Sequence, residues 1–113
     1  MSMQWYVAKF VYQIISGDGN HTPQFDEQLR LIRAEEFNWA KEKAILLGQL
    51  GEYSFVNQQQ QTVTWKFINV VDMTLVQTLE DGAELYSVTE EPTDVNSYLE
   101  VVSTRAKRLM TTC

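Results

Sequence analysis

The stretch Tyr6-Val7-Ala8-Lys9-Phe10-Val11-Tyr12-Gln13-Ile14-Ile15 predicts a long β-strand, because large apolar side chains recur at every second residue. We expect one face of this strand to lie in the core, and that face carries Tyr6, Ala8, Phe10, Tyr12 and Ile14. The opposite face is only half polar. A helix of the same chain or a partner subunit should therefore cover part of it.

Turn-forming residues follow this strand at four positions: Gly17, Gly19, Asn20 and Pro23. They predict a loop over residues 16–23, because these residues supply positive φ, side-chain-to-backbone bonds and a fixed φ. Alternation returns from Gln24 to Ile32, with Phe25, Leu29 and Leu31 on one side. This segment predicts a second strand that pairs with the first as an antiparallel hairpin.

A helix is predicted from about Glu35 to Leu47, where apolar residues recur at helical spacing and Gly48 offers a C-terminal cap. Trp39, Ile45 and Leu46 widen its apolar stripe beyond the minimum for packing on a sheet. The helix should therefore be either deeply buried or part of an interface.

The second half of the chain predicts more strands and another helix. Segments 53–56 and 62–71 are rich in aromatic and β-branched residues, and the glutamine run 58–61 separates them as a turn. Asp81-Gly82 is a hairpin-type turn signal, after which 84–88 predicts a further strand. A second helix should start near Pro92 and close the domain with an apolar face made of Val95, Tyr98, Leu99, Val102, Ala106 and Leu109.

These elements predict an α+β fold in the order ββα(β)βββα. It has an antiparallel sheet of about four to six strands and two helices packed on one face. The length of 113 residues suits a single domain over residues 1–113.

Composition narrows the function classes. A formal charge of −6 disfavours a nucleic-acid partner, because phosphate backbones would be repelled. The single cysteine, Cys113, is the last residue and cannot form an intramolecular disulfide. No signal peptide and no apolar run of about 20 residues is evident, so we expect a cytoplasmic protein with no membrane partner.

The loop carries the one candidate for acid–base chemistry. His21 is the only histidine, and Asp18, Asp26 and Glu27 are close enough in sequence to orient it or to share a bound ligand with it, so Glu27 and Asn20 are candidate ligand-binding residues. With no second histidine and no nearby cysteine, a tight zinc site cannot form within one subunit. Asp18, Asn20 and Asp26 could still bind a hard cation, but the twelve-residue loop signature for calcium is absent, and no metal or other cofactor is expected. Asp18 and Asn20 could equally well only shape the turn, with His21 packed beside Pro23.

Two tryptophans are candidate ligand or interface residues. Trp5 is in phase with Lys9 and Gln13, and Trp65 is in phase with Asn69, so both fall on the less apolar strand faces. They could line an apolar pocket or a dimer contact, although most aromatic residues of such a chain belong to its core.

Five short segments taken together, in their order and spacing, resemble a known family: Trp5-Tyr6-Val7-Ala8-Lys9, Gly17-Asp18-Gly19-Asn20-His21, Gln24-Phe25-Asp26-Glu27-Gln28-Leu29, Trp65-Lys66-Phe67 and Asp81-Gly82-Ala83-Glu84-Leu85-Tyr86. The chain is similar over nearly its whole length to the uncharacterised domain-of-unknown-function family 4288. The resemblance implies a small bacterial protein, and it supplies no activity, substrate or catalytic residues.

Two hypotheses for the function follow. The first is a non-catalytic module that forms a homo-oligomer, most simply a dimer, and binds a protein or a small ligand through aromatic strand faces. The alternative is a small isomerase or hydrolase in which His21 is the general acid or base, Asp18 or Asp26 orients it, and Trp5 or Trp65 covers the pocket.

Overall fold

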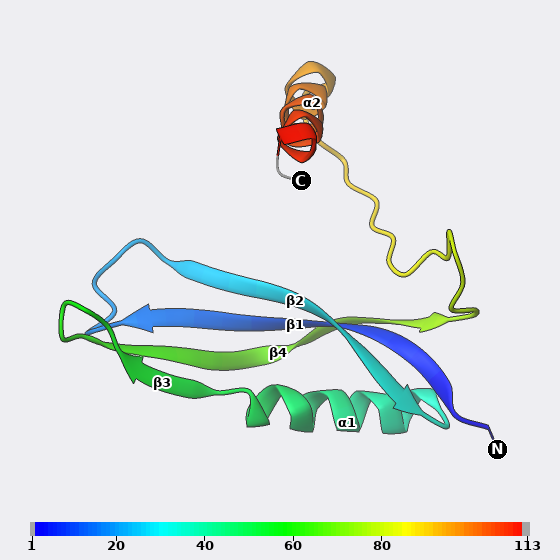
Figure 1. Ribbon diagram of the computed structural model, residues 1–113, viewed down its shortest axis with the longest axis horizontal. Coiled ribbons are helices and arrows are strands. Elements are labelled where there is room, and N and C mark those ends of the chain that lie inside the picture. Colours follow the sequence, from blue (N-terminus) through cyan, green and yellow to red (C-terminus); the bar gives the residue numbers. More distant parts are fainter. Residues whose placement is uncertain (1, 112–113) are drawn as a thin grey trace.

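The computed structural model describes residues 2–111, with side chains up to Met110, so Cys113 lies outside the described residues. The elements follow in the order β1 (Gln4–Ser16), β2 (Gln24–Ala34), α1 (Phe37–Leu50), β3 (Tyr53–Val56), β4 (Thr62–Val76) and α2 (Val95–Thr111). All strand pairs are antiparallel, and the sheet order is β2-β1-β4-β3 (Figure 1). The predicted α+β class is confirmed, with four strands.

The core lies between the central strand β1 and helix α1. The even-numbered residues from Tyr6 to Tyr12 point to the same side, as the alternation of the sequence predicts, and each is at most 3% exposed. Side chains of β4 complete this layer, among them Phe67, Val70 and Met73. We call this side of the sheet the α1-facing side and the opposite side the outer face.

Small residues of α1 face the sheet, which lets the helix approach closely. Ala40, Ala44 and Gly48 are its buried residues. The Tyr12 hydroxyl crosses the gap and donates to the Gly48 carbonyl oxygen at 2.8 Å, and burial raises the pKa of this phenol. The prediction that Gly48 caps the helix is wrong: α1 continues to Leu50 and its cap is Gly51.

The reason for this difference is the Phe67 ring, which lies where a Cβ on residue 48 would be. Gly48 is therefore required for close packing and not for a turn, and a glycine in a helical pattern cannot reveal which of the two applies.

Two irregularities in β4 change which residues share a face. Its register with β1 shifts between Lys9 and Phe10 and again between Val11 and Tyr12, so that Val71 and Ile68 are extra residues without a partner in β1. Both bulged residues are exposed. Side chains of β4 therefore do not alternate strictly between the two faces of the sheet along the whole strand.

The segment after β4 differs from the prediction. Asp81-Gly82 does form a turn, in which the Ala83 amide N–H donates to the Glu80 carbonyl oxygen at 3.0 Å and Gly82 has φ of 84°. The predicted strand 84–88 is wrong, because residues 83–94 contain neither strand nor helix. We call residues 77–94 the tail.

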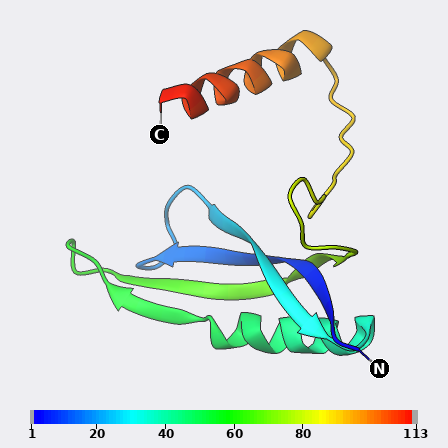
Figure 2. The ribbon, with the colours of Figure 1, turned by 45° about the vertical axis from the view of Figure 1, so that its right-hand side comes forward.

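Helix α2 does not close the domain, and the prediction that both helices pack on one face is wrong. Among the described residues, no Cα atom of α2 lies within 8 Å of a Cα atom in another helix or strand. In Figures 1 and 2, α1 lies below the sheet, whereas α2 stands above it at the end of the tail. Its side chains from Val95 to Met110 are all exposed.

Asp94 caps the start of α2, since its Oδ2 accepts bonds from the amide N–H and the hydroxyl of Ser97. These bonds hold the pKa of Asp94 below its usual value. The cap therefore stabilises the helix at neutral pH, and this stabilisation is lost as the pH falls through the lowered pKa.

We expect the Asp94→Ala variant to show a weaker helical circular dichroism signal than the wild type at neutral pH and an equal one in strong acid. Asp94→Asn is the control, because an amide caps without titrating. A difference between Asp94→Ala and the wild type that does not change with pH would contradict the charged cap.

Candidate functional site

The loop between β1 and β2 is held by hydrogen bonds from its backbone amide groups to β4 and to one of its own side chains. The Gly17 amide N–H donates to the Thr62 carbonyl oxygen at 2.9 Å, which ties the loop to the start of β4. Asp18 Oδ1 accepts the Asn20 amide N–H at 2.9 Å, and Gly17 and Gly19 have positive φ. Asp18 and Asn20 thus shape the turn.

Both ring nitrogens of His21 bond backbone groups. The Ser16 amide N–H donates to Nε2 at 2.9 Å, so the proton is on Nδ1, which lies 2.8 Å from the Thr22 carbonyl oxygen. The half-buried ring lines a hollow of about 260 Å³ together with Asp18, Gln13, Ile15 and Pro23, so the structure brings His21 and Asp18 to one hollow. To exchange a proton, His21 would first have to give up a bond that orders the loop, so its acid–base role remains a prediction.

Of the three carboxylates near His21 in sequence, Asp18 lines the same hollow, whereas the two in β2 are separated from each other in space. Asp26 and Glu27 are neighbours in β2, so they point to opposite faces of the sheet. Asp26 accepts a bond from Gln28 Nε2 at 2.6 Å, and Glu27 pairs with Lys9 at 2.6 Å. Closeness in the sequence is therefore a poor guide here, because the pleat of β2 places the Asp26 and Glu27 carboxylates on opposite faces of the sheet.

The two candidate tryptophans lie on opposite sides of the sheet. Trp5 is on the outer face, where the guanidinium of Arg33 lies 5.3 Å from its ring. Trp65 is on the α1-facing side, stacked on Tyr53 with ring centroids 5.6 Å apart and tilted against Tyr12. The bulge at Ile68 explains why Trp65 does not share a face with Asn69, and the two tryptophans cannot line one pocket.

A polar network that was not predicted anchors the tail to the outer face. The Tyr86 hydroxyl donates to Asp72 Oδ2 at 3.2 Å, and Lys9 Nζ lies 5.4 Å from the centre of the Tyr86 ring. The hydrogen bond from Lys9 to Glu27 raises the pKa of the Lys9 ammonium. Strand β2, strand β1 and the tail are thus connected through one lysine.

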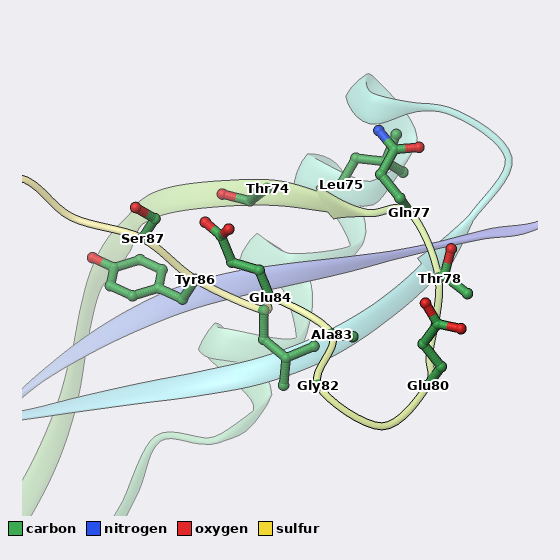
Figure 3. A pocket seen from close by; sticks show the side chains of 11 residues that line it. Thr74, Leu75, Gln77, Thr78, Glu80, Gly82, Ala83, Glu84, Tyr86 and Ser87 are labelled. Carbon is green, nitrogen blue, oxygen red and sulfur yellow. The ribbon is translucent and has the colours of Figure 1, made fainter.

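The tail also encloses an open hollow of about 490 Å³ against the end of β4 (Figure 3). Its lining is mixed: Glu80 and Glu84 carry charge, whereas Leu75, Leu85 and Tyr86 are apolar. The sequence predicts the turn at Asp81-Gly82, but it does not predict that the tail then runs back over the sheet.

Three exposed apolar surfaces are the most prominent feature of the molecule. The α1 strip consists of Trp39, Leu46 and Leu50, which lie on one side of the helix. The β2 stripe consists of Phe25, Leu29 and Leu31, which point to the outer face and are each at least 50% exposed. The α2 face includes Val95, Tyr98, Leu99 and Val102.

The described residues contain neither a cluster of metal-ligating side chains nor a helix that could cross a membrane. Among the described residues, no group of three or more His, Cys, Asp or Glu side chains is placed to hold a metal ion. Within the same residues, no helix combines the length and the apolarity that crossing a bilayer requires.

Comparison with protein families adds one result. A family model described as a domain of unknown function (DUF4288) matches residues 5–87. The chain belongs to this family. No curated protein and no solved structure matches the chain. The match to DUF4288 spans the sheet, α1 and the anchored part of the tail, and it ends before α2, so this helix lies outside the matched residues.

Proposed function

We propose that this DUF4288 protein is a non-catalytic interaction module that assembles into a homo-oligomer, with α2 as the arm that binds a second copy. The observation that supports this proposal is the apolar face of α2, which packs on no other helix or strand among the described residues. Tyr98, Leu99 and Val102 are between 41% and 55% exposed on one side of a capped helix.

Such a helix has little stability of its own. α2 has 17 residues, of which five are β-branched and one is alanine, and it is only slightly longer than the about 12–15 residues below which isolated helices are marginal even when rich in alanine. Most helical stability in proteins comes from packing an amphipathic face. The helix therefore needs an apolar surface to pack on.

Charge favours a second copy as the partner. α2 carries three cationic side chains and one carboxylate, whereas residues 1–94 carry six and fourteen. The arm of one subunit would thus approach an acidic body that also displays the α1 strip and the β2 stripe. The loop does not take part in this proposal, because the bonds of His21 are satisfied locally.

The test is the mass of the full-length protein in solution. We expect the wild type to be oligomeric and the Leu99→Gln/Val102→Gln variant to be shifted towards monomer in sedimentation velocity. Glutamine keeps the helix propensity while it removes the apolar face. Trp39→Ala measures whether the α1 strip contributes.

Two controls accompany this test. Thr104→Gln changes the opposite side of α2, and His21→Ala removes the loop imidazole; both variants should assemble as the wild type does. A wild type that remains monomeric at its highest soluble concentration would refute the proposed function.

A further inference from the structure

The two edges of the sheet are protected very differently. At one edge, β3 is only four residues long, β4 carries two bulges, and side chains bond two amide N–H groups of β4. The Phe67 N–H donates to Glu52 Oε2 at 2.9 Å, and the Val70 N–H donates to Asn69 Oδ1 at 2.8 Å. Bulges, short strands and covered backbone groups are the means by which proteins prevent pairing at an edge.

The other edge, β2, has neither bulges nor a short strand, and among the described residues only one of its backbone groups is covered by a side chain. It is 11 residues long, its register with β1 is regular from Gln24 to Ala34, and it contains no proline. Within the described chain, the one side chain bonded to its backbone is Lys43, which donates to the Arg33 carbonyl oxygen. The unpaired groups along this strand are thus a template for another strand.

The charges of β2 are arranged so that the strand complements itself. Its acidic residues, Asp26 and Glu27, precede its basic residues, Arg30 and Arg33. Two copies related by a two-fold axis run antiparallel, so the acidic half of each meets the basic half of the other. Resting on the self-association proposed above, we propose that β2 pairs antiparallel with β2 of a second copy, with Gln28 on the two-fold axis, to form a continuous eight-stranded sheet.

The position of the axis follows from comparing the neighbouring registers. With the axis at Gln28, Asp26 lies opposite Arg30 of the second copy and Phe25 lies opposite Leu31, and each pair occurs twice. With the axis at Arg30, Glu27 lies opposite Arg33, but two arginines also lie directly opposite each other at the axis, which is destabilising. With the axis at Leu29, no oppositely charged pair forms. The register centred on Gln28 alone pairs unlike charges and avoids like ones.

The side chains at this axis are already ordered for the contact. Gln28 donates to Asp26 and accepts bonds from Arg30 Nε and Nη2, at 2.6, 2.9 and 2.6 Å, so the three side chains form a ladder along the α1-facing side of the strand. Ordered side chains lose less entropy on binding than free ones. Pairing would also join the β2 stripes of the two copies on the outer face.

A cysteine cross-link tests this geometry in full-length protein with Cys113→Ser as the background. Opposite residues of paired strands lie at a Cβ separation of about 4.5–5.5 Å, close to disulfide reach. Gln28→Cys alone should form disulfide-linked dimers on oxidation. Asp26→Cys and Arg30→Cys should cross-link when the two variants are mixed, and neither should cross-link alone. Gln24→Cys is the matched control and should remain monomeric in a denaturing gel.

Charge reversal gives a second readout that leaves Gln28 unchanged. Asp26→Arg and Arg30→Asp should each raise the dimer dissociation constant on the order of tenfold, because two attractive pairs become repulsive. The double variant Asp26→Arg/Arg30→Asp should restore the wild-type value. Screening by salt should reduce the effect of each single variant.

The possible failures are distinguishable. In one case, the wild type is oligomeric and the Leu99→Gln/Val102→Gln variant is monomeric, but Gln28→Cys does not cross-link and charge reversal does not change the dissociation constant. This result would refute β2 pairing and leave the proposed function standing. If the wild type is monomeric under all conditions, both proposals fail. Cross-linking of Gln24→Cys at the rate of Gln28→Cys would also overturn the assigned register.

Discussion

Replacing Phe10 by alanine is expected to lower the free energy of unfolding by about 3–5 kcal/mol, the range for a fully buried phenylalanine. The Phe10 side chain is 0% exposed at the centre of β1. It packs edge-on against Phe67, with ring centroids 6.1 Å apart, and the Arg30 guanidinium lies 5.1 Å from its ring. Removing the Phe10 ring would leave a cavity between the sheet and α1, and the surrounding structure would relax only partly to fill it.

Urea denaturation followed by tryptophan fluorescence measures this change. Phe25→Ala is the matched control, because it removes the same atoms from a side chain that is 56% exposed. In dilute protein, Phe25→Ala should lower the free energy of unfolding by less than about 1 kcal/mol. Equal losses in the two variants would contradict a core centred on Phe10.

Gly48→Ala is expected to have the second largest effect, a loss of about 1–3 kcal/mol, although alanine is favoured over glycine in a helix by about 1 kcal/mol. A Cβ on this residue would overlap the Phe67 ring. The ring has little freedom to move away, since it lies 5.5 Å from the Tyr12 ring and 6.1 Å from the Phe10 ring. Tyr12 also bonds the Gly48 carbonyl oxygen.

Two further variants separate crowding from helix propensity. Gln49→Ala changes the adjacent, exposed residue of α1 and should leave stability within about 0.5 kcal/mol of the wild type. Combining Gly48→Ala with Phe67→Leu should cost less than the sum of the two single losses, because the smaller side chain makes room for the methyl group. Additive losses would show that the two residues are not in conflict.

For the candidate site, sequence reasoning identified residues but not their arrangement. His21, Asp18 and Asn20 do lie in one loop, and their bonds are local, which the turn chemistry of that segment anticipates. The separation of Asp26 from Glu27 follows from strand alternation once the hairpin is known. The position of Trp65 could not be predicted, because a bulge leaves no mark in a pattern of apolar residues.

The sequence by itself determined the elements whose signals are local. Alternation in β1 and β2 sets which side chains share a face, and the apolar spacing of α1 sets its existence, because both depend on the geometry of one continuous backbone segment. The self-complementary order of charges in β2 is likewise a property of the sequence.

Only the tertiary structure decided the rest. Gly48 became a packing residue because Phe67, from a distant strand, lies against it. The tail lies across the outer face because Tyr86 bonds Asp72 there and its ring contacts the Lys9 ammonium. Helix α2 has an apolar face that its sequence predicts, but the course of the tail places this helix away from every other helix and strand of the described residues. Such outcomes depend on contacts between residues far apart in the chain, and a local pattern does not encode them.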